Sequence, residues 1–238
     1  MAGKVAEKRR ATQPSENGSG YIAPLLTVDQ AFPNRLVGVV RSTSPETAFK
    51  ACLAAIEGGI GSVEVTTSVP DCFDIVRGLT ASTHDIPVGV GTVWDPGTVK
   101  RAKQVGASFI VTPVILEDVA AACRKQDILC VVGALTPTEI YQARLAGADV
   151  VKVFPVASMG GVDYLRYLAG PMPGLPLWVS GGVQLEEVAE YARLGVRAIG
   201  LTSGLFTPEA MARQDMATVR ERARRAAQSV AVVNAVRV

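Results

Sequence analysis

The sequence predicts an α/β protein whose eight parallel strands close into a barrel, each strand being followed by a helix. From Arg35 onward the chain repeats one pattern: a short run rich in β-branched residues, a turn, and an amphipathic helix. The pattern occurs eight times in 238 residues, which suits a single-domain TIM (β/α)8 barrel. The alternative is an open doubly wound sheet. It is disfavoured because no GxGxxG phosphate-binding motif follows the first strand.

The pattern places each element in order. The strands are expected at 36–40, 61–66, 88–92, 108–112, 129–132, 150–154, 177–180 and 198–201. Helices fill the gaps, as in 44–56, where Ser44 suits the N-cap, Pro45 suits the first helical position and Gly58 suits the exit. Short turns such as Val-Gly-Ala-Ser at 105–108 end a helix and begin the next strand. They carry structure rather than chemistry.

The two ends of the chain differ in character. Residues 1–20 are polar, basic and rich in Ser and Gly, without the apolar stretch of a signal peptide, and are expected to form a disordered tail. An organelle-targeting role is disfavoured because Glu7 and Glu16 do not suit an acid-poor transit peptide. Residues 21–238 are expected to form the barrel domain, ending in a C-terminal helix.

The composition of the chain disfavours several classes of function. A net charge of +2 gives no reason to expect nucleic acid or a membrane surface as a partner. No apolar run approaches the ~18 residues of a transmembrane helix. The four cysteines lack CxxC spacing and are expected to be buried free thiols, which indicates the cytoplasm. With His84 as the single histidine, a histidine-dependent triad, a metal site or another cofactor is not expected.

Lys152 interrupts the apolar strand predicted at 150–154. Because side chains alternate along a strand, Val150, Lys152 and Phe154 are expected on the interior face. Burial of an ammonium without a partner is costly and lowers its pKa toward the neutral amine. A neutral amine attacks ketones, which is the chemistry of a Schiff-base enzyme. The alternative is a lysine whose stem packs on apolar neighbours while its head reaches water.

A carboxylate is predicted inside the same barrel, because Ser62, Glu64 and Thr66 share the interior face of the second strand. Glu64 would be a general acid/base that moves protons around a Schiff base. The alternative is an ion pair with Lys152 or Arg41 that only cancels charge.

Two further strands are followed by polar residues at the carboxyl end of the barrel, and these residues would face the same mouth as Lys152 and Glu64. Arg41 ends the first strand as an inward cation that could bind a substrate carboxylate or phosphate, or balance Glu64, and substrate binding is favoured. Thr92 follows Gly91 at the end of the third strand and would offer its hydroxyl to the site.

Glycine-rich segments follow strands seven and eight, at Ser-Gly-Gly 180–182 and Gly-Leu-Thr-Ser-Gly 200–204. Loops at these places, leading into helix N-termini, commonly hold a phosphate in such barrels. The sequence therefore predicts a phosphorylated ligand or a similarly small anion, with plain loop glycines as the alternative.

Several motifs in this order resemble one family: Val-Glu-Val-Thr at 63–66, Gly-Val-Gly-Thr-Val at 89–93, Val-Thr-Pro at 111–113, Val-Lys-Val-Phe-Pro at 151–155, Gly-Gly at 160–161 and Ser-Gly-Gly-Val at 180–183. The chain resembles the 2-keto-3-deoxy-6-phosphogluconate (KDPG) aldolases from about Leu36 to Phe206. That family includes the 2-keto-4-hydroxyglutarate (KHG) and 2-keto-3-deoxy-6-phosphogalactonate aldolases.

The resemblance implies a metal-free class I aldolase that acts on a keto acid as a homotrimer. In that role Lys152 forms the imine and Glu64 shuttles protons through water. The resemblance assigns the pyruvate pocket to Thr92, Pro113 and Phe154, and the phosphate end to Ser180, Gly181, Gly182, Gly200 and Ser203.

The sequence departs from the family at Ser68, where the phosphogluconate branch carries an arginine that helps hold the carboxylate. Arg41 would take that role here, as in the phosphogalactonate branch, which the loop at 200–206 also resembles. Two other classes stay open. A phosphate-sugar isomerase or synthase barrel would share the glycine loops without needing Lys152, and a non-catalytic ligand-binding barrel would keep Lys152 as the ion-pair partner of Glu64.

Overall fold

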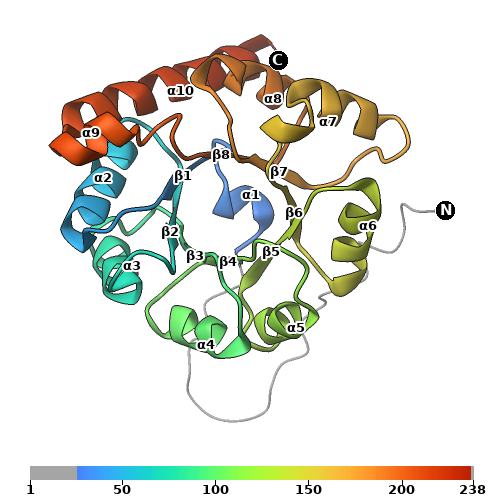
Figure 1. Ribbon diagram of the computed structural model, residues 1–238, viewed down its shortest axis with the longest axis horizontal. Coiled ribbons are helices and arrows are strands. Elements are labelled where there is room, and N and C mark those ends of the chain that lie inside the picture. The colour runs from blue at the N-terminus through green and yellow to red at the C-terminus, as the bar shows by residue number, and fades with distance from the viewer. Residues whose placement is uncertain (1–25, 237–238) are drawn as a thin grey trace.

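The computed structural model describes residues 26–236, and the tail expected at 1–20 lies outside them. Eight parallel strands pair in chain order, and β8 pairs with β1 to close the barrel (Figure 1). The predicted (β/α)8 barrel is therefore confirmed. The strands are β1 (Leu36–Val40), β2 (Ser62–Thr66), β3 (Val88–Gly91), β4 (Phe109–Val111), β5 (Leu129–Ala134), β6 (Val150–Val153), β7 (Leu177–Ser180) and β8 (Ala198–Leu201).

Helices surround the barrel (Figure 1). They are α2 (Pro45–Glu57), α3 (Cys72–Ser82), α4 (Pro96–Gln104), α5 (Glu117–Lys125), α6 (Pro137–Ala146), α7 (Val162–Ala169), α8 (Val188–Arg193), α9 (Pro208–Arg213) and the expected C-terminal helix α10 (Met216–Val236). Two 3-10 turns, η1 (Ala157–Met159) and η2 (Leu185–Glu187), interrupt the loops. The N-cap predicted for α2 is present, since Ser44 Oγ accepts a hydrogen bond from the Thr47 amide at 3.2 Å.

A short additional helix, α1 (Val28–Ala31), closes the amino end of the barrel and lies at its centre in Figure 1. The Ser62 hydroxyl donates to the Ala31 carbonyl at 2.6 Å, which ties α1 to β2. Phe32, directly after α1, meets Phe109 and Trp178 edge to face inside the barrel. A cluster of apolar side chains therefore forms a floor beneath the carboxyl ends of the strands.

Three predicted strands, β3, β4 and β6, end one residue earlier than expected, and at β3 and β6 this moves a predicted site residue out of the strand. β3 ends at Gly91 because Thr92 adopts a left-handed conformation, with φ of 59°. β6 ends at Val153, and Phe154 turns to the mouth, where 36% of its surface is exposed. Both residues therefore belong to loops at the carboxyl end of the barrel, where chemistry occurs in this fold.

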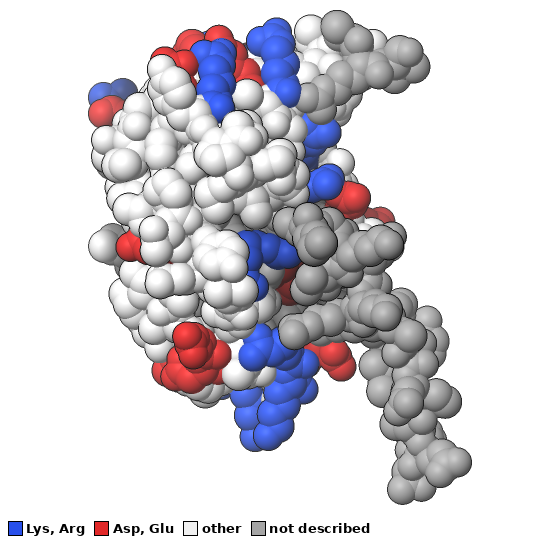
Figure 2. Space-filling model, turned by 90° about the vertical axis from the view of Figure 1, so that its right-hand side faces the viewer, with Lys and Arg blue, Asp and Glu red and all other residues white. Residues whose placement is uncertain are grey.

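On the surface at the right-hand side of Figure 1, the area left of centre in Figure 2 carries few charges. α6 and α7 lie on this side, and they expose Tyr141, Leu145 and Tyr167 to solvent. None of the helices within residues 26–236 combines the length and apolar character needed to cross a membrane.

Candidate active site

Lys152 lies on β6 and points into the barrel, where only 5% of the residue is exposed. The alternation predicted for this strand is confirmed over its first half, since Val150 belongs to the apolar floor. Lys152 is in register with Gly133 of β5 and Trp178 of β7. The amine thus stands directly above the floor.

Glu64 reaches the same point from β2. Its carboxylate is fully buried, and Oε2 lies 3.7 Å from Lys152 Nζ. Neither carboxylate oxygen has a hydrogen-bond partner among the described residues. Gly91 of β3 makes room for the carboxylate, because a Cβ at this position would lie 1.7 Å from Glu64 Oε1. This space explains why the third strand carries glycine there.

Burial shifts the pKa values of Lys152 and Glu64 in the directions that favour their uncharged forms. Desolvation lowers the pKa of Lys152, and nearby Arg41 adds to this effect while Glu64 opposes it. Desolvation also raises the pKa of Glu64, against the opposing charges of Lys152 and Arg41. Both shifts increase the fraction of the uncharged amine and of the protonated carboxyl group, and the uncharged amine is the form that attacks a ketone.

A cavity of about 530 Å3 opens above Lys152, whereas Glu64 is fully buried and is not among its lining residues. Six of the predicted site residues line it: Arg41, Lys152, Phe154, Ser180, Gly181 and Ser203. They come from the ends of β1, β6, β7 and β8, so the strand ends predicted to face one mouth do meet there. Val39, Thr202 and Phe206 also line the cavity.

The cationic side of the site is joined to Thr92. Arg41 is an exposed residue just beyond β1, and its guanidinium donates to Thr92 Oγ1 at 3.4 Å. The Thr67 hydroxyl donates in turn to the Thr92 carbonyl at 2.7 Å. Thr92 is thus held between Arg41 and the segment after β2, beside the cavity rather than in its lining.

The loops after β7 and β8 lead into helical segments, as expected. The loop after β7 leads into η2, which continues into α8. The loop after β8 leads into α9, a helix of six residues that Thr207 already caps by accepting from the Ala210 amide. Polar groups for an anion would come from the loops themselves, where Ser180 and Gly181 face Ser203 across the cavity.

The remaining predicted residues surround the cavity. Gly182 is exposed in the loop after β7, with φ of 87°. Gly200 lies beneath the cavity, where a Cβ would be 2.4 Å from Trp178 Nε1 and 2.9 Å from Ser180 Oγ. Pro113 follows β4, and its carbonyl oxygen would lie 2.2 Å from a Cβ at Gly133, the neighbour of Lys152. None of the three is in the cavity lining.

Sequence reasoning did not single out Trp178, whose ring centroid lies 5.6 Å from Lys152 Nζ. The alternation that places Ser180 in the interior also places Trp178 there, two residues earlier on the same strand. The pattern that could have found it was therefore present in β7.

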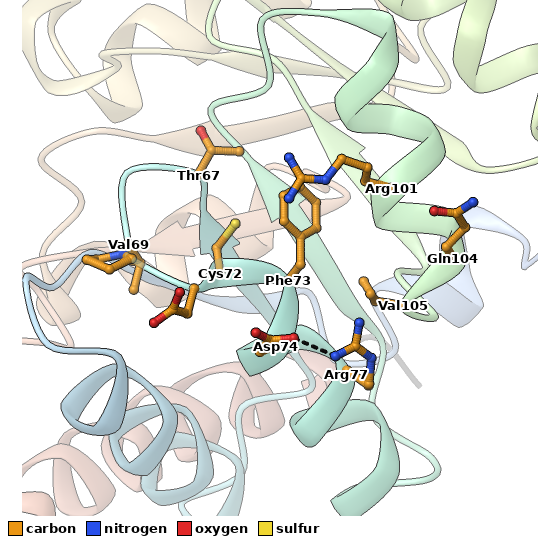
Figure 3. A pocket seen from close by; sticks show the side chains of 11 residues that line it. Thr67, Val69, Cys72, Phe73, Asp74, Arg77, Arg101, Gln104 and Val105 are labelled. Atoms are coloured by element: carbon orange, nitrogen blue, oxygen red, sulfur yellow. Dashed lines mark hydrogen bonds and ion pairs between the residues drawn. The ribbon is translucent and has the colours of Figure 1, made fainter.

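A second cavity, of about 440 Å3, lies between the segment after β2, α3 and α4 (Figure 3). The Arg101 guanidinium lies 4.1 Å from the Phe73 ring centroid, and Arg77 pairs with Asp74. None of the predicted site residues lines this cavity. Within residues 26–236, no group of three or more His, Cys, Asp or Glu side chains could hold a metal ion.

The family of the chain follows from its similarity to known proteins. The family model of KDPG and KHG aldolase matches residues 29–222. The chain belongs to this family. The resemblance seen in the sequence motifs is thereby confirmed.

Individual members of the aldolase family match over most of their length. A probable 2-dehydro-3-deoxy-6-phosphogalactonate aldolase of Rhizobium meliloti is 32% identical over 177 residues, which are 73% of this chain and 82% of the relative. The 2-dehydro-3-deoxy-phosphogluconate aldolase of Treponema pallidum is 30% identical over 70% of this chain and 80% of the relative. A KDPG aldolase of Legionella pneumophila, solved with pyruvate captured as a covalent carbinolamine, superposes with a TM-score of 0.74 at 25% identity. The match covers 83% of this chain and 95% of that one.

In this KDPG and KHG aldolase family member, Ser68 stands where the resemblance to the phosphogluconate branch leads us to expect an arginine. The Ser68 hydroxyl lies 2.8 Å from Thr66 Oγ1, which also donates to the Val40 carbonyl at 3.2 Å. The position is thus filled by a small hydroxyl network that carries no charge. Arg41 is the cation nearest in sequence to that network and lines the cavity.

Proposed function

We propose that the protein is a class I aldolase. It would reversibly cleave a 2-keto-3-deoxy sugar acid phosphate, or 4-hydroxy-2-oxoglutarate, into pyruvate and an aldehyde. The observation that carries the proposal is the buried pair at the base of the main cavity, with Lys152 Nζ 3.7 Å from Glu64 Oε2. The desolvated amine supplies the nucleophile, and the carboxyl group beside it supplies proton transfer.

The reaction begins when the neutral amine of Lys152 attacks the C2 ketone of the keto acid. The resulting carbinolamine loses water and becomes an iminium ion. The carboxylate of Glu64 then removes the proton of the C4 hydroxyl, directly or through water. The C3–C4 bond breaks, its electron pair moves into the iminium to form an enamine, and the aldehyde leaves.

The second half returns the enzyme to its starting state. Glu64 returns its proton to C3 of the enamine, which forms the iminium of pyruvate. Water adds to C2 and pyruvate leaves, so that Lys152 is again a free amine. The iminium is the electron sink throughout, so the mechanism needs no metal, and we expect activity to survive EDTA.

Substrate binding is assigned to the residues around the pair. Arg41 would hold the carboxylate of the keto acid, supported by its position at the cavity and its contact with Thr92. Phe154 would cover the imine carbon, with its ring 5.4 Å from Nζ. Pro113 would support the pocket from β4, next to Gly133.

The phosphate of a sugar acid phosphate would lie between the loops after β7 and β8. Ser180, Gly181 and Ser203 line that side of the cavity, Gly182 lies in the loop after β7, and Gly200 on β8 leaves room for Trp178 and Ser180. The amide and hydroxyl donors of such loops suit an anion without a dedicated cation.

We further propose a cytoplasmic homotrimer. The weakly charged face that carries Tyr141, Leu145 and Tyr167 supports association with further copies of the chain. Four buried free cysteines suit a reducing compartment. Neither nucleic acid nor a membrane enters this proposal as a partner.

One experiment tests the aldolase proposal against the isomerase, synthase and non-catalytic alternatives. The protein is incubated with pyruvate, reduced with sodium borohydride, weighed intact and mapped by peptide mass. A pyruvyl adduct on Lys152 is expected. A folded protein without an adduct would refute the Schiff-base mechanism and favour a barrel in which Lys152 only balances the charge of Glu64.

A further inference from the structure

We propose that Trp178 is a functional residue of this site, because its indole face stabilises the positive charge that forms on Lys152 Nζ with the imine. This inference rests on the proposed Schiff-base function. Nζ lies over the Trp178 ring, 5.6 Å from its centroid, and also over the Phe154 ring, 5.4 Å from that centroid. Both distances fall within the roughly 6 Å over which a cation is attracted to an aromatic face. The reacting nitrogen therefore has two aromatic neighbours, of which Trp178 is the buried one.

The orientation of the indole is fixed by its surroundings. β7 places Trp178 in register with Lys152, and its side chain is fully buried. The rings of Phe32 and Phe109 pack against it at interplanar angles of 70° and 67°. The floor of the barrel thus holds the indole in place while Nζ remains over its face.

Packing alone does not account for an indole at this position. Trp178 Nε1 is buried and has no hydrogen-bond partner among the described residues. Its edge fits only because Gly200 lacks a side chain, since a Cβ there would lie 2.4 Å from Nε1. A phenylalanine or leucine would fill the floor without burying an unpaired donor, which costs free energy. A contribution to the chemistry would explain why tryptophan is present.

Neither charged group near Nζ is suited to stabilise the iminium throughout the reaction, which leaves this role to the Trp178 ring. When the iminium forms, Glu64 has to accept and return protons, so it is not a permanent counter-ion. Arg41 carries the same sign as the iminium and disfavours it. An aromatic face neither exchanges protons nor carries a positive charge. It also attracts a cation more strongly where water is excluded. Trp178 meets this condition better than Phe154, because Phe154 is partly exposed.

The test measures how much imine forms, rather than activity. Wild-type protein and the variants Trp178→Phe and Trp178→Leu are exposed to a range of pyruvate concentrations with a short pulse of cyanoborohydride. The adduct fraction is then read by intact mass. Phe109→Leu is the matched control, because Phe109 touches the same indole in the same floor but does not face Nζ. Thermal unfolding checks that each variant is folded, and Trp178→Met replaces Trp178→Leu if the latter is not.

We expect Trp178→Leu to form about five- to thirty-fold less adduct at subsaturating pyruvate. Trp178→Phe should stay within about three-fold of wild type, because it keeps an aromatic face, and Phe109→Leu should behave as wild type. Equal adduct in wild type and Trp178→Leu would overturn the inference alone. So would an equal loss in Phe109→Leu, which would assign the effect to packing. A wild-type protein that forms no adduct would refute the proposed function and this inference with it.

Discussion

Lys152 Nζ and Glu64 Oε2 lie 3.7 Å apart at the base of the barrel mouth, and both side chains are buried. The separation is longer than a normal charge-assisted hydrogen bond. Burial moves both pKa values toward the neutral forms. A pair whose only role was to cancel charge would gain most from a short ionic contact. At 3.7 Å the two groups are close enough for a proton to pass between them through a single bridging atom, such as a water oxygen.

Replacing Lys152 by Met should abolish aldol cleavage while the protein stays folded. Methionine has a similar length and no amine, so the apolar floor keeps its packing while imine formation is lost. Pyruvate release is measured with a coupled assay, and folding by circular dichroism. Turnover clearly above that of an enzyme-free control would contradict the Schiff-base assignment.

Replacing Glu64 by Gln should slow cleavage by roughly 10² to 10⁴ while part of the borohydride trapping remains. The amide keeps the shape of the side chain but cannot accept the proton of the C4 hydroxyl. Single-turnover cleavage and trapping are measured on the same preparation. If cleavage proceeds at nearly the wild-type rate, Glu64 is only a counter-ion.

Replacing Gly91 by Ala should damage the site through Glu64. The new Cβ would lie 1.7 Å from Glu64 Oε1, so the carboxylate must move. We expect about a 10²-fold loss of cleavage, with destabilisation on the order of 1 to 3 kcal/mol from overpacking. Gly170→Ala is the control, because a Cβ there meets only the Tyr167 carbonyl at 3.8 Å. Unchanged activity in Gly91→Ala would mean that the carboxylate position does not matter.

Replacing Arg41 by Ala should lower kcat/KM by roughly ten- to a hundred-fold for every keto acid, phosphorylated or not. The reason is the loss of a charge-assisted contact to the carboxylate that all these substrates share. Arg77→Ala is the control, since Arg77 lines the second cavity and pairs with Asp74. A loss confined to phosphorylated substrates would instead assign Arg41 to the phosphate.

The stability difference between Lys152→Met and wild type should depend on pH. Burial lowers the pKa of Lys152 below its ordinary value of 10.5, so the folded protein binds fewer protons than the unfolded chain between these two values. Wild-type stability therefore rises with pH through this window, and the variant lacks this rise. Glu64, left without its cationic neighbour in the variant, acts in the same direction. We expect an advantage of the variant that shrinks as pH approaches 10.5, measured by urea unfolding. An advantage that grows with pH would contradict the lowered pKa.

The barrel could be predicted from the sequence because the periodicity of apolar residues depends directly on local secondary structure. The eight β-branched runs and the turns between them gave the strands in order, and alternation placed Lys152 and Glu64 inside. The left-handed conformation of Thr92 was not predictable, because it depends on what surrounds the end of β3. The helix α1 was also missed, since four residues carry too little periodicity to be recognised. Its position inside the barrel follows only from tertiary packing.

Trp178 shows a different limit of what can be predicted from the sequence. Its place on the interior face follows from the same alternation as that of Ser180, yet an apolar residue in a strand reads first as core. Only its distance to Nζ and its unpaired Nε1 separate it from an ordinary core residue. Both depend on how β6, β7 and β8 come together, which the sequence of no single strand reveals.

The plug formed by α1 has a consequence for the order of events. Because Ala31 and Phe32 seal one end of the barrel, reactants and products share a single entrance on the opposite side. In the proposed reaction the aldehyde lies nearer that entrance than the three-carbon fragment bound to Lys152. Substrate binding and product release are then ordered. Pyruvate binds first during synthesis and leaves last during cleavage. Product inhibition would show this sequence directly, with pyruvate competing against the keto acid that is cleaved and the aldehyde acting as a noncompetitive inhibitor.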